Sequence, residues 1–190
     1  LLAAGGQLGG SFEVVWVNDG SADGTGRVLD ELAAADERIR PVHLSRNFGH
    51  MAALTAGLDL CRATEAVICL DSDGQHPPEL LPEMVARWRE GADIVQMVRT
   101  RSQGESAFKR WTSRGFYRLM KWLANVDIQP GFADFRLMDR QVVDALRAMP
   151  ERARFIRGMV RWVGYRTDYI EYEAPPRMGG ETKYSAFRML

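Results

Sequence analysis

The sequence predicts an α/β domain in which helices cover both faces of a mostly parallel β-sheet. Segments with strand character alternate with segments of helical periodicity through the first half of the chain, as in successive strand–helix–strand units. The run at 65–71, EAVICLD, is apolar almost without interruption, which is typical of a strand buried on both faces. The chain has 190 residues, and no internal repeat or clear linker divides it. We therefore expect a single domain with its own core.

Each expected element follows from its composition and from the residues at its ends. Six segments rich in apolar and β-branched residues are expected to be strands: 12–18, 39–45, 65–71, 93–98, 134–139 and 167–174. Helical periodicity follows each of the first three strands and returns in a basic segment after the fourth: 21–37, 49–63, 77–91 and 106–125. Ser21 or Asp23 is expected to cap the first helix, and Gly91 to end the third. Two further helices are expected between residues 139 and 167.

Charge is divided unevenly along a chain whose net charge is zero. Residues 1–98 hold 15 acidic and 7 basic side chains, a balance of −8, whereas residues 99–190 hold 10 acidic and 18 basic ones, a balance of +8. This asymmetry predicts an anionic partner for the second half. Cys61 and Cys69 fit no metal or redox spacing, which is typical of a reduced, cytosolic setting. No stretch approaches the roughly 18 apolar residues of a membrane span, and none resembles a signal peptide.

Acidic residues follow two of the expected strands. Asp19 comes after 12–18, and Asp71 and Asp73 come at the end of the apolar run at 65–71. In an open parallel sheet, ligands bind beyond the carboxyl ends of the strands, so these side chains are candidates for a binding site. With 13 Asp in the chain, about one Asp-x-Asp pair is expected by chance. The prediction therefore depends on the position of the pair rather than on the pattern alone.

The Asp71 and Asp73 pair is a candidate metal site. Two carboxylates one residue apart repel each other unless a proton or a cation joins them. Mg²⁺ and Mn²⁺ take oxygen ligands from one or two carboxylates together with substrate phosphates. The alternative is that both residues cap a helix and form the turn before Pro77 and Pro78.

Six motifs occur in order along the chain: VNDGSADGT, LSRNFGHMAALTAGLD, LDSDGQHPPELLPEM, ADFRLMDR, RFIRGMVRWVGY and GGETKY. Together they resemble the family 2 glycosyltransferases, and within them the polyprenyl-phosphate glycosyltransferases similar to dolichol-phosphate mannose synthase and bacterial undecaprenyl-phosphate glucosyltransferases. The resemblance runs from about Phe12 to Leu190. It implies an A-type nucleotide-diphospho-sugar transferase fold. It also implies an inverting, Mg²⁺- or Mn²⁺-dependent enzyme that moves a hexose from a UDP- or GDP-sugar to an undecaprenyl or dolichyl phosphate.

The resemblance further implies segments outside residues 1–190. Members of this group usually begin with another strand that helps to hold the nucleotide, and many carry membrane helices near the carboxyl terminus. We expect these 190 residues to lack the first strand and any such helices. The domain is expected at the cytoplasmic face of the membrane, either peripherally or anchored by segments outside this chain.

The resemblance assigns donor-side roles residue by residue. Asp19 would face the uridine or guanosine part of the donor. Asp71 and Asp73 would bind the metal and the diphosphate, and Gln75 would be a polar partner in the same site. The glycine-rich segment around GGETKY would be a mobile lid whose cation, Lys183, acts on the leaving diphosphate together with Arg177. An ordinary surface loop is the alternative for this segment.

Acceptor-side roles fall on Asp134 and on three arginines. Asp134 would be the general base or would orient the acceptor, although a strong base is not obligatory because the acceptor phosphate is already anionic near neutral pH. Ala133 departs from the Gly that many relatives have before Asp-Phe-Arg. Guanidinium groups match phosphate oxygens, so three arginines are candidates for the acceptor phosphate: Arg99, Arg101 and Arg136. A solvated surface role is the alternative for the first two.

A basic, aromatic helix is expected to meet an anionic membrane surface. In the segment 106–125, cations recur at helical spacing and form one stripe beside aromatic residues: Arg110, Arg114, Arg118 and Lys121. The pattern is repeated by Arg154, Arg157 and Arg161. The alternative is that the aromatic residues belong to the core and the cations are merely solvated.

Three classes of function remain open from the sequence. The favoured one is a glycosyltransferase that acts on a lipid phosphate. The second is a soluble glycosyltransferase with a saccharide or protein acceptor, which would share the donor motifs but not the basic second half. The third is a non-catalytic module such as a receiver domain, which gives no reason for two acids one residue apart. No nucleic-acid partner is expected, and a homo-oligomer is left open.

Overall fold

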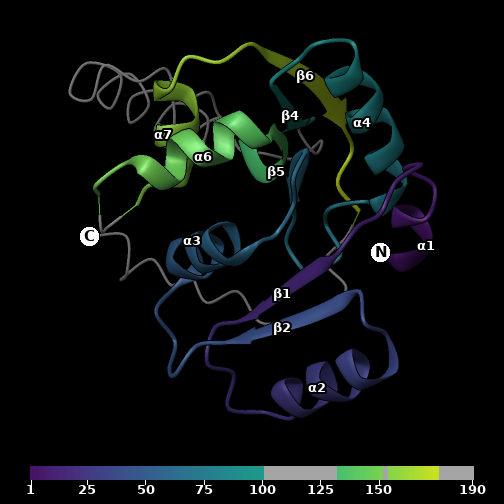
Figure 1. The fold of residues 1–190 in the computed structure, drawn as a ribbon, viewed down its shortest axis with the longest axis vertical. Helices are drawn as coiled ribbons and strands as arrows, with labels where there is room; N and C mark the ends of the chain where they lie inside the picture. Colours follow the sequence, from purple (N-terminus) through teal and green to yellow (C-terminus); the bar gives the residue numbers. More distant parts are fainter. Residues whose placement is uncertain (101–131, 152–153, 176–190) are drawn as a thin grey trace, which may run out of the picture.

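The computed structural model describes residues 1–100, 132–151 and 154–175. All six predicted strands are present: β1 Val14–Asn18, β2 Ile39–His43, β3 Ala66–Cys69, β4 Ile94–Arg99, β5 Phe132–Asp139 and β6 Thr167–Tyr172. The helices of these residues are α1 Leu2–Gly5, α2 Thr25–Ala35, α3 His50–Leu60, α4 Leu81–Arg89, α6 Arg140–Ala148 and α7 Ile156–Trp162, with a 3₁₀ turn η1 at Pro78–Leu80 (Figure 1). The predicted basic helix at 106–125 lies outside the described residues.

The predicted caps were partly wrong. Helix α2 begins at Thr25 with Gly24 as its N-cap, so neither Ser21 nor Asp23 is the cap. Asp23 lies one residue before the cap, and its Oδ1 accepts hydrogen bonds from the backbone N–H and the hydroxyl of Thr25. Ser21 instead donates its backbone N–H to the side-chain oxygen of Asn18 at 2.9 Å, which turns the chain at the end of β1. Gly91 closes α4 as predicted, since its φ of 101° lies in a region that side chains other than hydrogen rarely allow.

The strands form two groups. Strands β1 and β2 pair in parallel, and a second sheet has the order β3-β5-β4-β6. Strand β4 is parallel to β6, whereas β5 is antiparallel to both β3 and β4. Strands β3, β4 and β6 therefore run in one direction, and β5 alone opposes them. The predicted mostly parallel α/β architecture is confirmed, with β5 as an exception that the sequence did not indicate.

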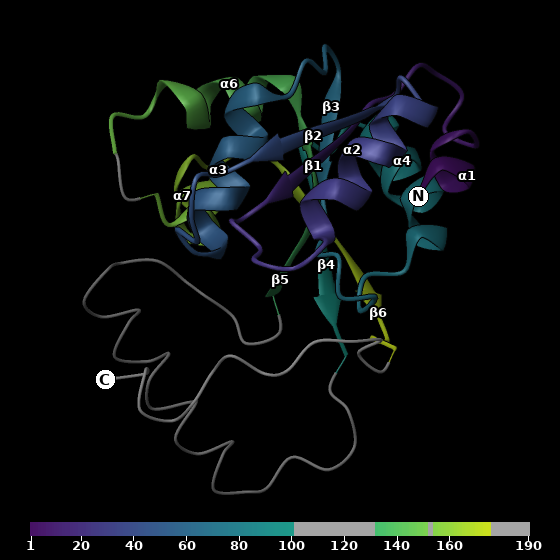
Figure 2. The ribbon, with the colours of Figure 1, turned by 90° about the horizontal axis from the view of Figure 1, so that it is seen from below.

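Helices cover both faces of the four-stranded sheet, as predicted (Figure 2). On one face α4 packs on side chains of β4, β5 and β6, in a cluster that includes Met84, Val95 and Phe135. On the other face α3, α6 and α7 pack together over a cluster that includes Leu58, Met138 and Val142. Strand β5 lies inside the sheet and its side chains alternate between the two faces. Polar residues of β5 on the second face are consequently enclosed by α3 and α7.

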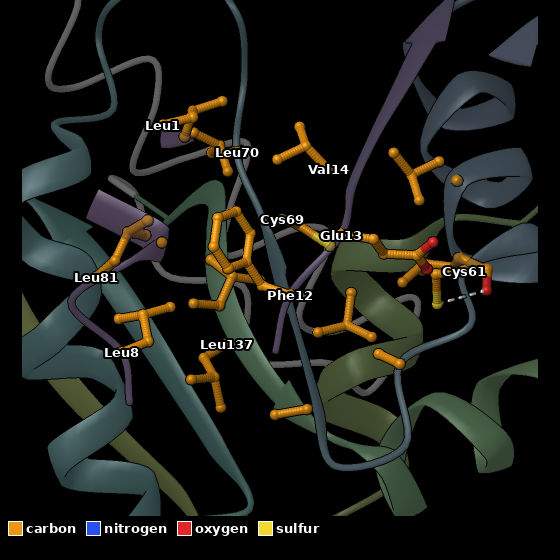
Figure 3. A pocket seen from close by; sticks show the side chains of 18 of the residues that line it. Leu1, Leu8, Phe12, Glu13, Val14, Cys61, Cys69, Leu70, Leu81 and Leu137 are labelled. Atoms are coloured by element: carbon orange, nitrogen blue, oxygen red, sulfur yellow. Dashed lines mark hydrogen bonds between the residues drawn. The ribbon is translucent and has the colours of Figure 1, made fainter. Parts of the chain in front are cut away.

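A cavity of about 750 Å³ separates β1 from β3. Its walls come from both strands and from α3 and α4, and most of the lining side chains are apolar (Figure 3). Among the described strands, β1 pairs only with β2 and β3 only with β5. Val14 of β1 donates its backbone N–H to the carbonyl of Arg38, and the carbonyl of Glu65, just before β3, accepts the N–H of Arg140. These two bonds show which backbone groups of β1 and β3 face their paired strands and which face the cavity. By the two-residue alternation of a strand, the cavity-facing amides are those of Val15, Val17, Ala66 and Ile68.

Candidate active site

The predicted acidic pair lies at the carboxyl edge of the four-stranded sheet. Asp71 and Asp73 follow the end of β3. Because β3, β4 and β6 run in the same direction, their carboxyl ends meet at this edge. Arg99, the last residue of β4, lies beside Tyr172, the last residue of β6, in the parallel register. The charges of Asp71, Asp73 and Arg99 all act on the Tyr172 hydroxyl, although burial is the main cause of its raised pKa.

The buried side chain of His76 forms a hydrogen bond with the backbone at Asp71. The Nδ1 atom of His76 accepts the backbone N–H of Asp71 at 2.8 Å, and its Nε2 atom lies 3.8 Å from the Asp71 carboxylate. The ring is stacked on Phe135 with 4.8 Å between ring centroids. Burial lowers the pKa of His76, which the nearby Asp71 charge opposes. A neutral ring with Nδ1 as acceptor therefore fixes the backbone at Asp71.

Asp134 is the centre of a cluster of cations. It lies on β5 with Arg136 two residues further on, so both side chains project from the same face of the strand. Arg136 donates from Nη2 to Oδ1 of Asp134 at 2.7 Å. The other oxygen, Oδ2, accepts from His50 Nε2 at 2.8 Å and from Arg157 Nε and Nη2 at 2.9 and 2.6 Å. His50 is the first residue of α3 and Arg157 belongs to α7, so three separate elements meet at this carboxylate.

The buried members of this cluster differ sharply from the accessible ones. The side chains of Asp134 and Arg136 are 1% and 2% exposed, whereas those of His50 and Arg157 are 43% and 41% exposed. Burial alone would raise the pKa of Asp134, but the hydrogen bonds from His50 and Arg157 and the guanidinium charges outweigh it and hold that pKa far below its usual range. The hydrogen bond to Asp134 in turn raises the pKa of His50, against the effect of burial. A carboxylate this weakly basic favours an orienting role over proton abstraction.

His50 joins the two halves of the site. Its Nε2 atom lies 2.8 Å from Asp134 and 3.7 Å from Oδ1 of Asp71. The acidic pair that follows β3 and the cations held by Asp134 are therefore neighbours. An arrangement of this kind can hold a cation on one side and an anion on the other.

Asp19 positions the loop that leads to His50. Its Oδ1 accepts the backbone N–H of Phe48 at 2.7 Å, and its Oδ2 accepts that of Gly49 at 3.0 Å. Gly20 has a φ of 64°, and a side chain there would collide with the backbone of the same loop. Asp19 therefore binds the backbone of the loop before α3 and does not cap α2. Contact with the donor nucleoside stays a prediction.

The remaining predicted residues are distributed as follows. The backbone N–H of Gln75 donates to Oδ1 of Asp73 at 3.0 Å, and its side chain reaches the carbonyl of Pro175 at 3.5 Å. Arg136 is brought into the site, but it is enclosed behind Asp134, so direct contact with a phosphate stays a prediction. Three predicted residues lie outside the described ones: Arg101, Arg177 and Lys183.

The acidic pair fits a cation that shares its ligands with a substrate. No group of three or more His, Cys, Asp and Glu side chains within the described ranges could by itself hold a metal ion. Asp71 and Asp73 supply two carboxylates at a partly exposed edge. This donor set suits Mg²⁺ or Mn²⁺ when phosphate oxygens and water complete the shell, and it does not suit a closed structural metal site.

Three residues of the site were not predicted from the sequence: His50, His76 and Arg157. In the sequence the histidines show no metal-ligand spacing, His76 has the position of a helix-start residue, and Arg157 is one member of a basic stripe. One signal was available. An acid and a cation two residues apart on a strand expected to be buried call for further partners, because a buried charge must be compensated.

A sequence profile described as glycosyl transferase family 2 matches residues 3–147. The chain belongs to glycosyl transferase family 2. The predicted family and the A-type nucleotide-diphospho-sugar transferase fold are thereby confirmed, and a non-catalytic receiver domain is excluded.

Several curated relatives match nearly the whole chain. An uncharacterized glycosyltransferase of Bacillus subtilis is 43% identical over 180 residues, 95% of this chain and 55% of the relative. A prophage bactoprenol glucosyl transferase homolog of Escherichia coli is 39% identical over 93% of this chain and 58% of the relative. The bactoprenol glucosyl transferase of Shigella phage SfV is 38% identical over 93% of this chain and 57% of the relative. The chain thus spans a little more than half the length of these relatives.

Within residues 1–100, 132–151 and 154–175, no helix combines the length and the hydropathy needed to cross a bilayer.

Proposed function

We propose that this domain transfers a hexose, with inversion, from a UDP- or GDP-sugar to a polyprenyl phosphate in a metal-dependent reaction. The observation that carries the proposal is the meeting of two oppositely charged half-sites: the acidic pair after β3 and the cations gathered on Asp134, with His50 between them. A donor diphosphate bound through a cation needs the first half, and a second, separately bound phosphate needs the other. The relatives named bactoprenol glucosyl transferase support the same substrate class.

The chemistry needs little proton transfer. A phosphate oxygen of the acceptor attacks the anomeric carbon, and the bond from that carbon to the donor diphosphate breaks. The bonding electron pair leaves with the nucleoside diphosphate, so nothing is oxidised or reduced. A phosphate monoester has its second pKa near 6 and is largely dianionic at neutral pH, so no base has to remove a proton first. This agrees with the low basicity of Asp134.

Donor binding falls to the acidic edge and to the loop that Asp19 anchors. Asp71 and Asp73 would hold Mg²⁺ or Mn²⁺, and a bound cation would supply Lewis-acid stabilisation of the leaving diphosphate. His76 keeps the backbone at Asp71 in place for this. Asp19 would contact the nucleoside and Gln75 the diphosphate. Lys183 and Arg177 would add positive charge as the leaving group departs.

Acceptor binding falls to the cationic half-site and to the basic second half of the chain. Arg99 and Arg101 would face the acceptor phosphate, and Arg136 would contribute its charge from behind Asp134. The predicted basic helix at 106–125 would lie on an anionic bilayer. The exposed aromatic residues of α7 and its N-cap, Trp162 at 74% and Phe155 at 47%, suit the same interface. The cytoplasmic face of the membrane is the proposed location, because nucleotide sugars would reach the acidic edge there.

A radiolabelled-sugar assay tests the proposal. Purified full-length protein is incubated with Mg²⁺, labelled UDP- or GDP-hexose and either undecaprenyl phosphate or a saccharide acceptor, and products are partitioned between organic solvent and water. Label should enter the organic phase only when the lipid phosphate is present. Label transferred instead to a saccharide or protein would support the alternative, a soluble glycosyltransferase with a different acceptor.

A further inference from the structure

His50 and Arg157 are the accessible side chains of the Asp134 cluster. We infer that Arg157 and His50 together receive the phosphate monoester of the acceptor, with Asp134 as the buried anchor that aims both of them. The inference rests on the proposed function and goes beyond it, because it adds two groups that would contact the acceptor phosphate to the predicted arginines.

Accessibility selects these two residues. Asp134 and Arg136 are enclosed, at 1% and 2% exposure, so a ligand cannot touch them without a rearrangement of the core. His50 and Arg157 are more than two-fifths exposed and keep their inner faces on Asp134. An anion that approaches the cluster from solvent therefore meets their side chains first.

Geometry brings the two side chains together. His50 Nε2 and Arg157 Nε and Nη2 all bind the same atom, Oδ2 of Asp134. Groups that share one oxygen atom are necessarily adjacent, and they come from different helices, α3 and α7. The shared anchor removes rotamer freedom from a long arginine side chain before any ligand arrives, which lowers the entropic cost of binding. A planar guanidinium held in this way matches the oxygens of a phosphate group.

Charge favours a dianion at this position. The single negative charge of Asp134 faces two guanidinium groups, and Arg136 is paired with its other oxygen at 2.7 Å. Asp134 therefore shares its charge between Arg136 and Arg157. Asp71 Oδ1 lies 3.7 Å from His50 Nε2, and it belongs to the acidic half-site. A phosphate monoester bound beside the cluster would be attracted by both guanidinium groups.

The position also suits the direction of the reaction. Displacement at the anomeric carbon requires the attacking oxygen and the leaving diphosphate on opposite sides of that carbon. The diphosphate is assigned to the acidic edge after β3. His50 contacts both Asp71 and Asp134, so a phosphate on Arg157 and His50 would lie next to the edge assigned to the diphosphate, within reach of the same sugar.

The contrasting interpretation is that Arg157 and His50 only neutralise a buried acid. Both interpretations predict that their loss harms the protein, so the test needs a measurement that a merely structural role would not change. We suggest Arg157→Ala, Arg157→Lys and His50→Gln, with Arg87→Ala as the matched control. Arg87 forms an ion pair with Asp168 at 3.3 Å on the surface, away from the site.

The measurement compares two short-chain competitors of the acceptor, a prenyl phosphate and its methyl ester, which carries one charge less. Full-length protein is assayed with saturating donor, and inhibition constants are obtained for both competitors, together with KM for donor and acceptor. For Arg157→Ala we expect acceptor KM and the inhibition constant of the prenyl phosphate to rise about 10- to 100-fold, as for loss of a hydrogen bond between charged groups. The donor KM should stay within about twofold.

The ratio between the two competitors decides the matter. The parent protein and Arg87→Ala should prefer the dianionic competitor, Arg157→Ala should lose most of that preference, and Arg157→Lys should keep part of it because the charge remains. His50→Gln should raise acceptor KM by a smaller factor. An unchanged preference in Arg157→Ala, or in Arg157→Lys if the alanine variant does not fold, would overturn the inference. If the parent protein formed no glycosyl lipid at all, the proposed function itself would fail, which is a distinct result.

Discussion

Substitution of Asp134 by Asn should destabilise the domain far more than loss of an ordinary surface carboxylate. The side chain of Asp134 is 1% exposed, and it is the counter-charge for Arg136, which is 2% exposed. Removal of one partner from a buried ion pair costs about 3–5 kcal/mol, because the other charge is left without compensation. The asparagine amide keeps one oxygen as an acceptor, so the lower end of the range, about 3 kcal/mol, is expected. Against a total stability of about 5–15 kcal/mol, this is a large loss.

Urea denaturation followed by circular dichroism measures the change in the free energy of unfolding, and a thermal melt of the same proteins measures the change in Tm. For a domain of this size, about 3 kcal/mol corresponds to a fall in Tm of roughly 6–12 °C. The matched control is Asp168→Asn, which removes the carboxylate from the exposed pair with Arg87 at 3.3 Å and should cost about 0–1 kcal/mol. An Asp134→Asn protein as stable as the Asp168→Asn protein would show that Arg136 does not depend on this carboxylate, and the description of the cluster as a charge-compensated centre would be wrong.

Three further predictions concern the metal, pH and the cavity. Chelator should abolish transfer until Mg²⁺ or Mn²⁺ returns, and Asp71→Asn and Asp73→Asn should each reduce turnover at least about 100-fold; full activity in chelator would remove the metal from the account. The raised pKa of His50 stabilises the fold below its unfolded value of about 6.5, and this contribution is lost as pH rises through the folded pKa. Thermal melts in chelator should therefore show a steeper alkaline loss for the parent than for His50→Gln, and parallel curves would contradict this. We also propose that an additional strand of the full-length protein lies between β1 and β3. Because it would form hydrogen bonds with the cavity-facing amides, Val15 and Ile68 should exchange their amide hydrogens as slowly as their neighbours Trp16 and Val67. Much faster exchange at the first two would show that the edges are open.

The α/β architecture and the acidic half of the site could be predicted from local patterns. The apolar run at 65–71 predicted a buried strand, and the acids at its end predicted a binding site at the carboxyl edge of the sheet. Asp71 and Asp73 do lie at this edge. The direction of β5 could not be predicted in this way. A strand buried on both faces has the same composition whether its neighbours run parallel or antiparallel to it.

The cationic half of the site depends on contacts that no local pattern reports. Asp134 and Arg136 are two residues apart, and their common face was implied by strand geometry. Their partners are not local: His50 is 84 residues from Asp134 and Arg157 is 23 residues from it. In the sequence Arg157 looks like one member of a surface stripe, and only the packing of α7 on the sheet turns it toward Asp134. The hydrogen bonds between Asp19 and the loop before α3 were likewise not predicted, because their partners lie 29 and 30 residues away along the chain.

Recognition of the acceptor through its phosphate can be tested with two lipids that differ only in that group. Full-length protein, Mg²⁺ and a labelled nucleotide sugar are incubated with a polyprenyl phosphate or with the polyprenol of the same chain length, and glycosylated lipid is quantified by mass spectrometry. Product is expected from the phosphate and essentially none from the alcohol, because the phosphate supplies an attacking oxygen that is already anionic and a charge that the cations on Asp134 would bind. Equal product from the alcohol, or product only on a saccharide added to the same mixture, would contradict this expectation.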